Sequence, residues 1–178
     1  MAEGRTSFLQ KWHGFLKRPR EDRRLILRAA LLLPLTEIGL RWFGFLRCKK
    51  LIEKFFLPAQ IPHSLPSDLA REAALRSVRA IRSVELHGPT NPNCLERSMA
   101  LWWMLRRNGI PGELHIGARK EGARFEAHAW VELGGEVLND GAEVHQHYAR
   151  FDAPIAAAVA KSHAADRADS NANSKGAF

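Results

Sequence analysis

Between Asn93 and Asp140 the spacing of the apolar residues changes once. It is helical at first, and after Gly109 apolar and polar residues alternate. Asn93 can cap a helix that runs from Cys94 to Arg107, and Gly109 follows as a stop signal. After this helix, apolar and polar residues alternate in short stretches that are separated by turns. The pattern predicts an α+β fold in which one helix precedes an antiparallel meander.

The length and the cysteine content narrow the fold class further. A chain of 178 residues is the size of one globular domain, so a second full domain is excluded. The only cysteines are Cys48 and Cys94, so a fold that depends on several disulfide bonds is excluded. Free thiols in a chain without a clear export signal predict a reducing, cytoplasmic location.

The excess of positive over negative charge lies entirely in the first third of the chain. Residues 1–60 hold 13 Lys and Arg against 5 Asp and Glu, whereas residues 61–150 hold 11 of each. Nucleic-acid binding requires a cationic face, so a neutral main domain argues against it. The basic N-terminal region therefore needs an explanation of its own.

An apolar run extends from Arg23 to Phe56, but Arg28, Pro34 and Glu37 interrupt it before the length of a clean membrane span. We expect two helices here, with Pro34 kinking or ending the first, and Gly39 or Gly44 loosening the second. The first interpretation is a helical layer of the domain core. The second is peripheral contact with anionic lipid, and the third is docking of an acidic peptide or partner protein. The expected lipid head-group contacts are Lys17, Arg18, Arg20, Arg23 and Arg24.

The remaining segments complete a predicted division of the chain into three regions. Residues 57–67 are proline-rich and read as an extended connector, and a helix follows from Ser67 or Asp68 to about Leu86. An alanine-rich helix is expected over 153–165, before a disordered tail. The predicted regions are a basic helical region (1–60), a core domain (61–150), and a C-terminal helix with its tail (151–178).

Cys94 is the candidate nucleophile. A thiol in the first turn of a helix faces unpaired backbone N–H groups and the positive end of the helix dipole, which favour the thiolate. Cys48 lies inside an apolar helix and reads as a small core residue. The same backbone N–H groups are the expected oxyanion donors, and the candidate side-chain donors are Asn91, Asn93 and Trp130.

A thiolate nucleophile needs an imidazole base and an acid that orients it, and His128 and Asp140 can fill these roles. A three-residue or bulged turn at Leu133–Gly135 would pair His128 directly with Asp140, so we predict such a turn. Glu126 and Glu143 are the alternative acids. His145 and His147 could bind zinc, but no further ligand has suitable spacing, so neither a metal nor a cofactor is expected.

The chain resembles the transglutaminase-like cysteine peptidases that mature lasso peptides. The segments that carry the resemblance are Asn93–Leu101, Arg106–Pro111, Ile116–Lys120, Phe125–Glu132 and Asn139–Asp140. Within them, the run Ala127–Val131 is the usual signature around the catalytic histidine of this family. The resemblance implies a papain-like core, in which the helix bearing the cysteine packs on an antiparallel sheet.

The resemblance further implies that Cys94, His128 and Asp140 form a catalytic triad that removes the leader from a ribosomally made precursor peptide. An asparagine-synthetase-like, ATP-dependent cyclase would then close the ring. The first 60 residues show no strand pattern for a winged-helix leader-binding domain, so that domain is expected on a separate protein.

Two other readings stay open. The same triad could perform another acyl transfer, such as transamidation or amide hydrolysis of a small molecule, because a fold does not choose the acyl acceptor. The chain could also be a non-catalytic binding protein that keeps these residues for packing.

Overall fold

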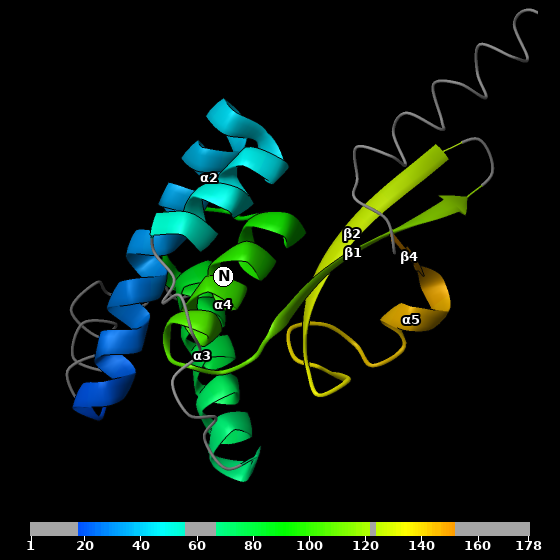
Figure 1. The fold of residues 1–178 in the computed structure, drawn as a ribbon. Coiled ribbons are helices and arrows are strands. Elements are labelled where there is room, and N and C mark those ends of the chain that lie inside the picture. Colours follow the sequence, from blue (N-terminus) through cyan, green and yellow to red (C-terminus); the bar gives the residue numbers. More distant parts are fainter. Residues whose placement is uncertain (1–17, 56–66, 122–123, 152–178) are drawn as a thin grey trace, which may run out of the picture. The chain divides into compact units, whose positions relative to one another are not determined.

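The computed structural model describes residues 18–55, 67–121 and 124–151. Its helices are α2 (Arg20–Phe55), α3 (Ser67–His87), α4 (Cys94–Arg107) and α5 (Val144–His147) (Figure 1). Its strands are β1 (Glu113–Glu121), β2 (Arg124–Leu133), β3 (Glu136–Val137) and β4 (Ala149–Arg150). The predicted α+β class is confirmed. Connector residues 57–66, the predicted helix at 153–165, the tail after it and Lys17 lie outside the described residues.

The chain forms two compact units. The first consists of Met1–Leu114 with Ala129–Ala142, and the second of His115–His128 with Glu143–Phe178. The strands form one sheet in the order β3-β2-β1-β4. Strands β1 and β2 each begin in one unit and end in the other.

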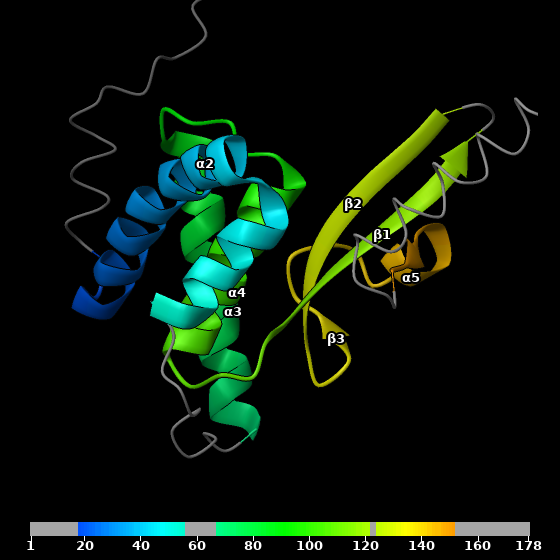
Figure 2. The same ribbon diagram turned by 45° about the horizontal axis from the view of Figure 1, so that its top comes forward.

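In the first unit, α2, α3 and α4 pack against one another around a shared apolar core (Figure 2). The face of α4 that enters this core combines Leu101 and Leu105 with Met104, all of them almost fully buried. Small residues of α3, such as Ala70 and Ala74, let the helices approach closely. The predicted bounds of α3 and α4 agree with the structure to within one residue.

The second unit contains most of β1, the first half of β2, helix α5 and strand β4. Strand β4 is antiparallel to β1, with Gly117 opposite Arg150 and Ala118 opposite Ala149. Directly after β4, the backbone N–H of Phe151 donates to the carbonyl of Ile116 at 3.0 Å.

The turn between β2 and β3 differs from the one predicted. Leu133 pairs with Glu136, so the loop has only two residues, Gly134 and Gly135, and the three-residue or bulged turn is wrong. Both glycines have positive φ, of 58° and 84°. Two successive positive φ angles fit a tight hairpin turn that matches the strand twist, and glycine reaches them without strain.

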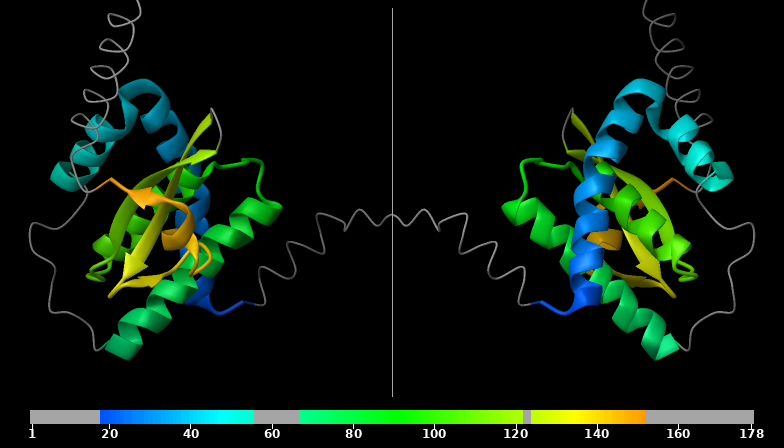
Figure 3. Two further views of the ribbon diagram at one scale, coloured as in Figure 1. Left: turned by 90° about the vertical axis from the view of Figure 1, so that its right-hand side faces the viewer. Right: turned by 90° about the vertical axis from the view of Figure 1, so that its left-hand side faces the viewer.

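Helix α2 breaks at Gly44, one of the glycines that the sequence singled out, and Pro34 does not end it. Pro34 lies within the helix, and the only non-helical backbone inside α2 is at Gly44, with φ 70° and ψ 169°. Figure 3 shows the two halves of α2, coloured from blue to cyan, meeting at a bend. This φ and ψ combination is essentially restricted to glycine, so Gly44 sets where the helix turns back.

We predict that Gly44→Ala destabilises the protein by about 1–3 kcal/mol, because a Cβ strains this backbone conformation. Urea unfolding monitored by circular dichroism measures the change. Glu37→Ala, on the exposed side of the same helix, is the matched control and should stay within about 0.5 kcal/mol of the wild type. Equal stability of wild type and Gly44→Ala would show that the bend does not depend on glycine.

Candidate active site

Cys94 is the first residue of α4, and its position is fixed by a capping box. The side-chain Oδ1 of Asn93 accepts the backbone N–H of Glu96 at 3.0 Å, and Glu96 Oε2 accepts the backbone N–H of Asn93 at 2.8 Å. Cys94 is half-buried and carries a free thiol. The predicted placement of this thiol in a first helical turn, at the positive end of the helix dipole, is therefore confirmed.

Cys48 has the surroundings of a core residue. Its side chain is buried, its Sγ lies 3.7 Å from the Sδ of Met99, and burial raises the pKa of its thiol. A raised pKa keeps the thiol protonated at neutral pH, and the protonated form is a poor nucleophile. The reading of Cys48 as a packing residue agrees with this environment.

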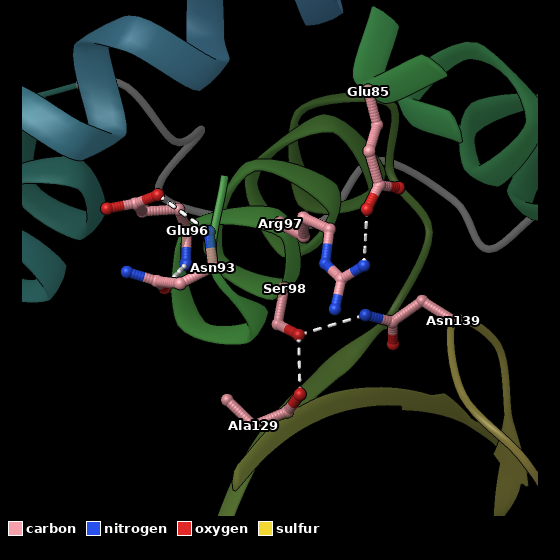
Figure 4. A network of polar contacts seen from close by, with 7 residues as sticks. All are labelled: Glu85, Asn93, Glu96, Arg97, Ser98, Ala129 and Asn139. Carbon is pink, nitrogen blue, oxygen red and sulfur yellow. Dashed lines mark hydrogen bonds and ion pairs between the residues drawn. The ribbon is translucent and has the colours of Figure 1, made fainter. Parts of the chain in front are cut away.

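One turn after Cys94, the buried hydroxyl of Ser98 joins three segments of the first unit (Figure 4). Ser98 Oγ donates to the carbonyl of Ala129 at 2.8 Å and accepts a hydrogen bond from Asn139 Nδ2 at 2.9 Å. The other amide atom of Asn139, Oδ1, accepts the backbone N–H of Val131 at 2.8 Å. Helix α4, strand β2 and the segment after β3 are thus tied at one point.

Two of the residues that form these hydrogen bonds are sequence neighbours of candidate catalytic residues. Ala129 follows His128, and Asn139 precedes Asp140. Sequence analysis did not single out Ser98 or Asn139 individually. The sequence offered one signal for Asn139: it lies directly before the candidate acid Asp140 and shortly after the Gly134–Gly135 turn.

Asp140 is exposed, and its Oδ1 accepts the backbone N–H of Gly141 at 2.7 Å. It borders a pocket of about 460 Å³ in the first unit, between α3, α4 and the segment after β3. Two further lining residues, Glu85 and Arg97, form a half-buried ion pair at 2.6 Å. The pocket is also lined by apolar side chains of α3 and α4, such as Ile81 and Leu101.

Cys94 and Asp140 belong to the first unit and His128 to the second. Within the second unit, the half-buried ring of His128 stacks on Tyr148, with ring centroids 4.9 Å apart and an angle of 26° between the planes. Such stacking restricts the rotation of the imidazole. Tyr148 was not among the residues predicted to contribute to the site.

Glu126, an alternative acid in the sequence analysis, is engaged elsewhere in the second unit. Arg119 Nε donates to Glu126 Oε2 at 2.7 Å, and the hydroxyl of Tyr148 donates to Glu126 Oε1 at 3.1 Å. These bonds, that of Arg119 first, lower the pKa of Glu126 and keep it ionised at neutral pH. The carboxylate thereby holds the ring on which His128 stacks.

The other candidates have the following environments. Trp130 is fully buried, and its Nε1 donates to Glu132 Oε1 at 2.5 Å, whereas Asn91 is exposed. Glu143, the second alternative acid, is exposed. Across the residues that the structure describes, no group of three His, Cys, Asp or Glu side chains is arranged to hold a metal ion.

We predict that Ser98→Ala destabilises the protein by about 1–3 kcal/mol, because it leaves the buried Ala129 carbonyl and the Asn139 amide without this partner. Ser77→Ala is a matched control: that hydroxyl is equally buried but bonds only to the carbonyl of Ala73 in its own helix. A double-mutant cycle of Ser98→Ala with Asn139→Ala in urea unfolding should give a coupling energy of at least about 0.5 kcal/mol. Strict additivity would mean that the two side chains do not form one network.

Comparison with known proteins identifies the family. Residues 43–152 match the family described as the transglutaminase-like superfamily. The Microcin J25-processing protein McjB of Escherichia coli is 44% identical over 48 residues, which span 27% of this chain and 22% of McjB. No solved structure matches the chain. Because the family match covers more than half of its residues, the chain belongs to the transglutaminase-like superfamily.

Proposed function

We propose that this protein is a cysteine peptidase that removes the leader from a ribosomally made lasso-peptide precursor. The similarity to a protein whose name describes microcin processing carries the proposal, together with membership of the transglutaminase-like superfamily. Cys94 is the proposed nucleophile, His128 the general base and Asp140 the acid that orients it. The location of Cys94 at the start of a capped helix supports its role.

The proposed reaction has two steps. Cys94 Sγ forms a bond to the scissile carbonyl carbon while His128 takes the thiol proton, and that proton then goes to the amine of the peptide fragment that leaves as the C–N bond breaks. A water molecule, deprotonated by His128, next attacks the thioester and releases the other fragment as a carboxylate. Backbone N–H groups at the start of α4 are the proposed oxyanion donors.

The proposal includes a papain-like core, in which α4 packs on an antiparallel sheet. The hydrogen bond from Ser98 of α4 to Ala129 of β2 supports this arrangement. The proposed domain organisation keeps residues 61–150 as the catalytic core, after a basic helical region (1–60) and before the C-terminal region (151–178). The family match begins earlier, at residue 43, directly before the bend of α2 at Gly44.

The proposed partners follow from the same family. They are the leader of the precursor peptide, a separate winged-helix protein that binds this leader, and an asparagine-synthetase-like, ATP-dependent cyclase that acts on the released peptide. The proposed location is the cytoplasm, where such a precursor is made. A nucleic-acid partner is not proposed, since residues 61–150 are neutral overall.

Alkylation by iodoacetamide tests whether Cys94 is activated. At about pH 7 we expect Cys94 to react at least about ten-fold faster than Cys48, whose burial keeps it as a thiol. His128→Ala should slow the labelling of Cys94 at least about ten-fold and leave Cys48 unchanged. The folded protein is labelled first and then digested, and mass spectrometry of the peptides measures the labelling of each cysteine separately. Equal rates at Cys94 in both proteins would exclude a functional Cys–His pair.

Cleavage of the microcin J25 precursor, with and without an added leader-binding protein, tests the reaction itself. We expect Cys94→Ala to abolish cleavage and Asp140→Asn to slow it by about 10²-fold or more, at unchanged stability. Asp68→Asn, an exposed carboxylate at the start of α3, is the control and should retain full activity. Conjugation of an added primary amine instead of hydrolysis would identify a transferase. Unchanged biological activity of Cys94→Ala would identify a binding protein.

A further inference from the structure

Helix α2 exposes an apolar stripe along the side that faces away from the core. The stripe follows helical spacing, and its members are 52–78% exposed: Leu27, Leu31, Leu35, Ile38 and Trp42. The opposite side of the same helix is buried in the core through Ala29, Leu32 and Leu33. A continuous exposed apolar surface of this kind marks an interaction site. We propose that it rests on the surface of a membrane that contains anionic lipids.

The apolar surface continues past the bend at Gly44. The two halves of α2 border a groove of about 400 Å³ with an almost entirely apolar lining. Leu31, Leu35, Phe43 and Leu51 line this groove and are themselves exposed at the surface. Both halves of the helix therefore present one apolar surface, and its shape depends on the glycine bend.

The charges around this surface are positive. Helix α2 carries nine Lys and Arg against four Asp and Glu. Three of these four acids form ion pairs within the protein: Glu21 and Asp22 share Arg76 of α3, and Glu53 pairs with Lys49. The exposed cations are Arg20, Arg24, Arg28, Arg41, Arg47, Lys50 and Lys54. This combination of apolar stripe and cations complements anionic head groups above acyl chains, whereas the centre of a protein interface is depleted in charge.

The packing of α2 favours a helix that lies on the membrane over one that crosses it. Its length and composition would allow a span, and only 22% of its most apolar stretch is buried within the protein. However, Ala29 and Leu33 are almost completely buried against the other helices, and a spanning helix would have to give up these contacts. Trp42, 78% exposed beside Arg41, suits the interfacial depth at which tryptophan is favoured.

Sedimentation with lipid vesicles tests the proposal on the full chain. Vesicles with about one third phosphatidylglycerol in phosphatidylcholine should bind the protein at least about ten-fold more tightly than phosphatidylcholine alone, and about 0.5 M NaCl should weaken this binding. Leu31→Gln with Trp42→Gln should reduce binding at least about ten-fold. Arg24→Gln with Arg28→Gln should do the same, since each cation contributes about a five-fold effect.

Control variants outside α2 test whether vesicle binding is specific to this surface. Leu86→Gln, a 65% exposed leucine of α3, and Arg79→Gln, an exposed arginine of the same helix, should bind vesicles like the wild type. Circular dichroism verifies that each variant is folded. Cys94→Ala should also bind normally, so the result is independent of the proposed peptidase activity.

The blue shift of tryptophan fluorescence on vesicle addition gives a second readout, which should disappear in Trp42→Phe. Equal binding to neutral and anionic vesicles would overturn the proposal, as would vesicle binding that the α2 variants leave unchanged. Absence of vesicle binding, combined with loss of a protein partner in the same α2 variants, would assign the surface to protein docking instead.

Discussion

The hydroxyl of Ser98 is the point on which the first unit depends. It is fully buried, and it donates to the carbonyl of Ala129 while it accepts from the amide of Asn139. Each of these groups would cost free energy in an apolar interior without a partner, so the three segments stabilise one another. The helix that begins with Cys94 is thereby held to the residues of β2 that follow His128 and to the segment that precedes Asp140.

The helices of the first unit provide the rigid support for this arrangement. The capping box at Asn93 and Glu96 fixes where α4 begins, and the ion pair of Arg97 with Glu85 connects α4 to α3. Helix α4 thus carries a hydrogen-bonded buried serine, a buried apolar face and an ion pair to α3. Little rotation of α4 is possible without breaking at least one of them, and this fixes the position of the thiol within its unit.

Local signals made the helices predictable. Asn93 caps the first turn of α4 with its side chain, and Gly109 follows the end of the helix. Both signals act within a few residues of the helix, so they can be read without knowledge of the rest of the chain. The break in α2 was harder to assign, because Pro34 and Gly44 are both helix breakers. Proline within a helix loses one hydrogen bond and packing can compensate, whereas the φ and ψ angles at Gly44 are incompatible with helix for any residue.

The predicted pairing of β2 with β3 was wrong because it took the strand after the glycine turn to continue to Asp140. The short turn pairs Val131 with Leu138, and the N–H of Leu138 donates to the carbonyl of Val131 as the ladder requires. The reciprocal donor, the N–H of Val131, goes instead to the side-chain Oδ1 of Asn139.

The side chain of Asn139 thus takes the place of a backbone acceptor and ends the ladder, which explains why β3 stops at Val137. Once the ladder has ended, alternation between the two faces of a sheet no longer dictates the orientation of Asp140. A three-residue turn is then unnecessary for a role of Asp140 in catalysis. The hydrogen bonds of Asn139 to Ser98 and Val131 fix the chain directly before Asp140, a tertiary effect that strand periodicity alone cannot reveal.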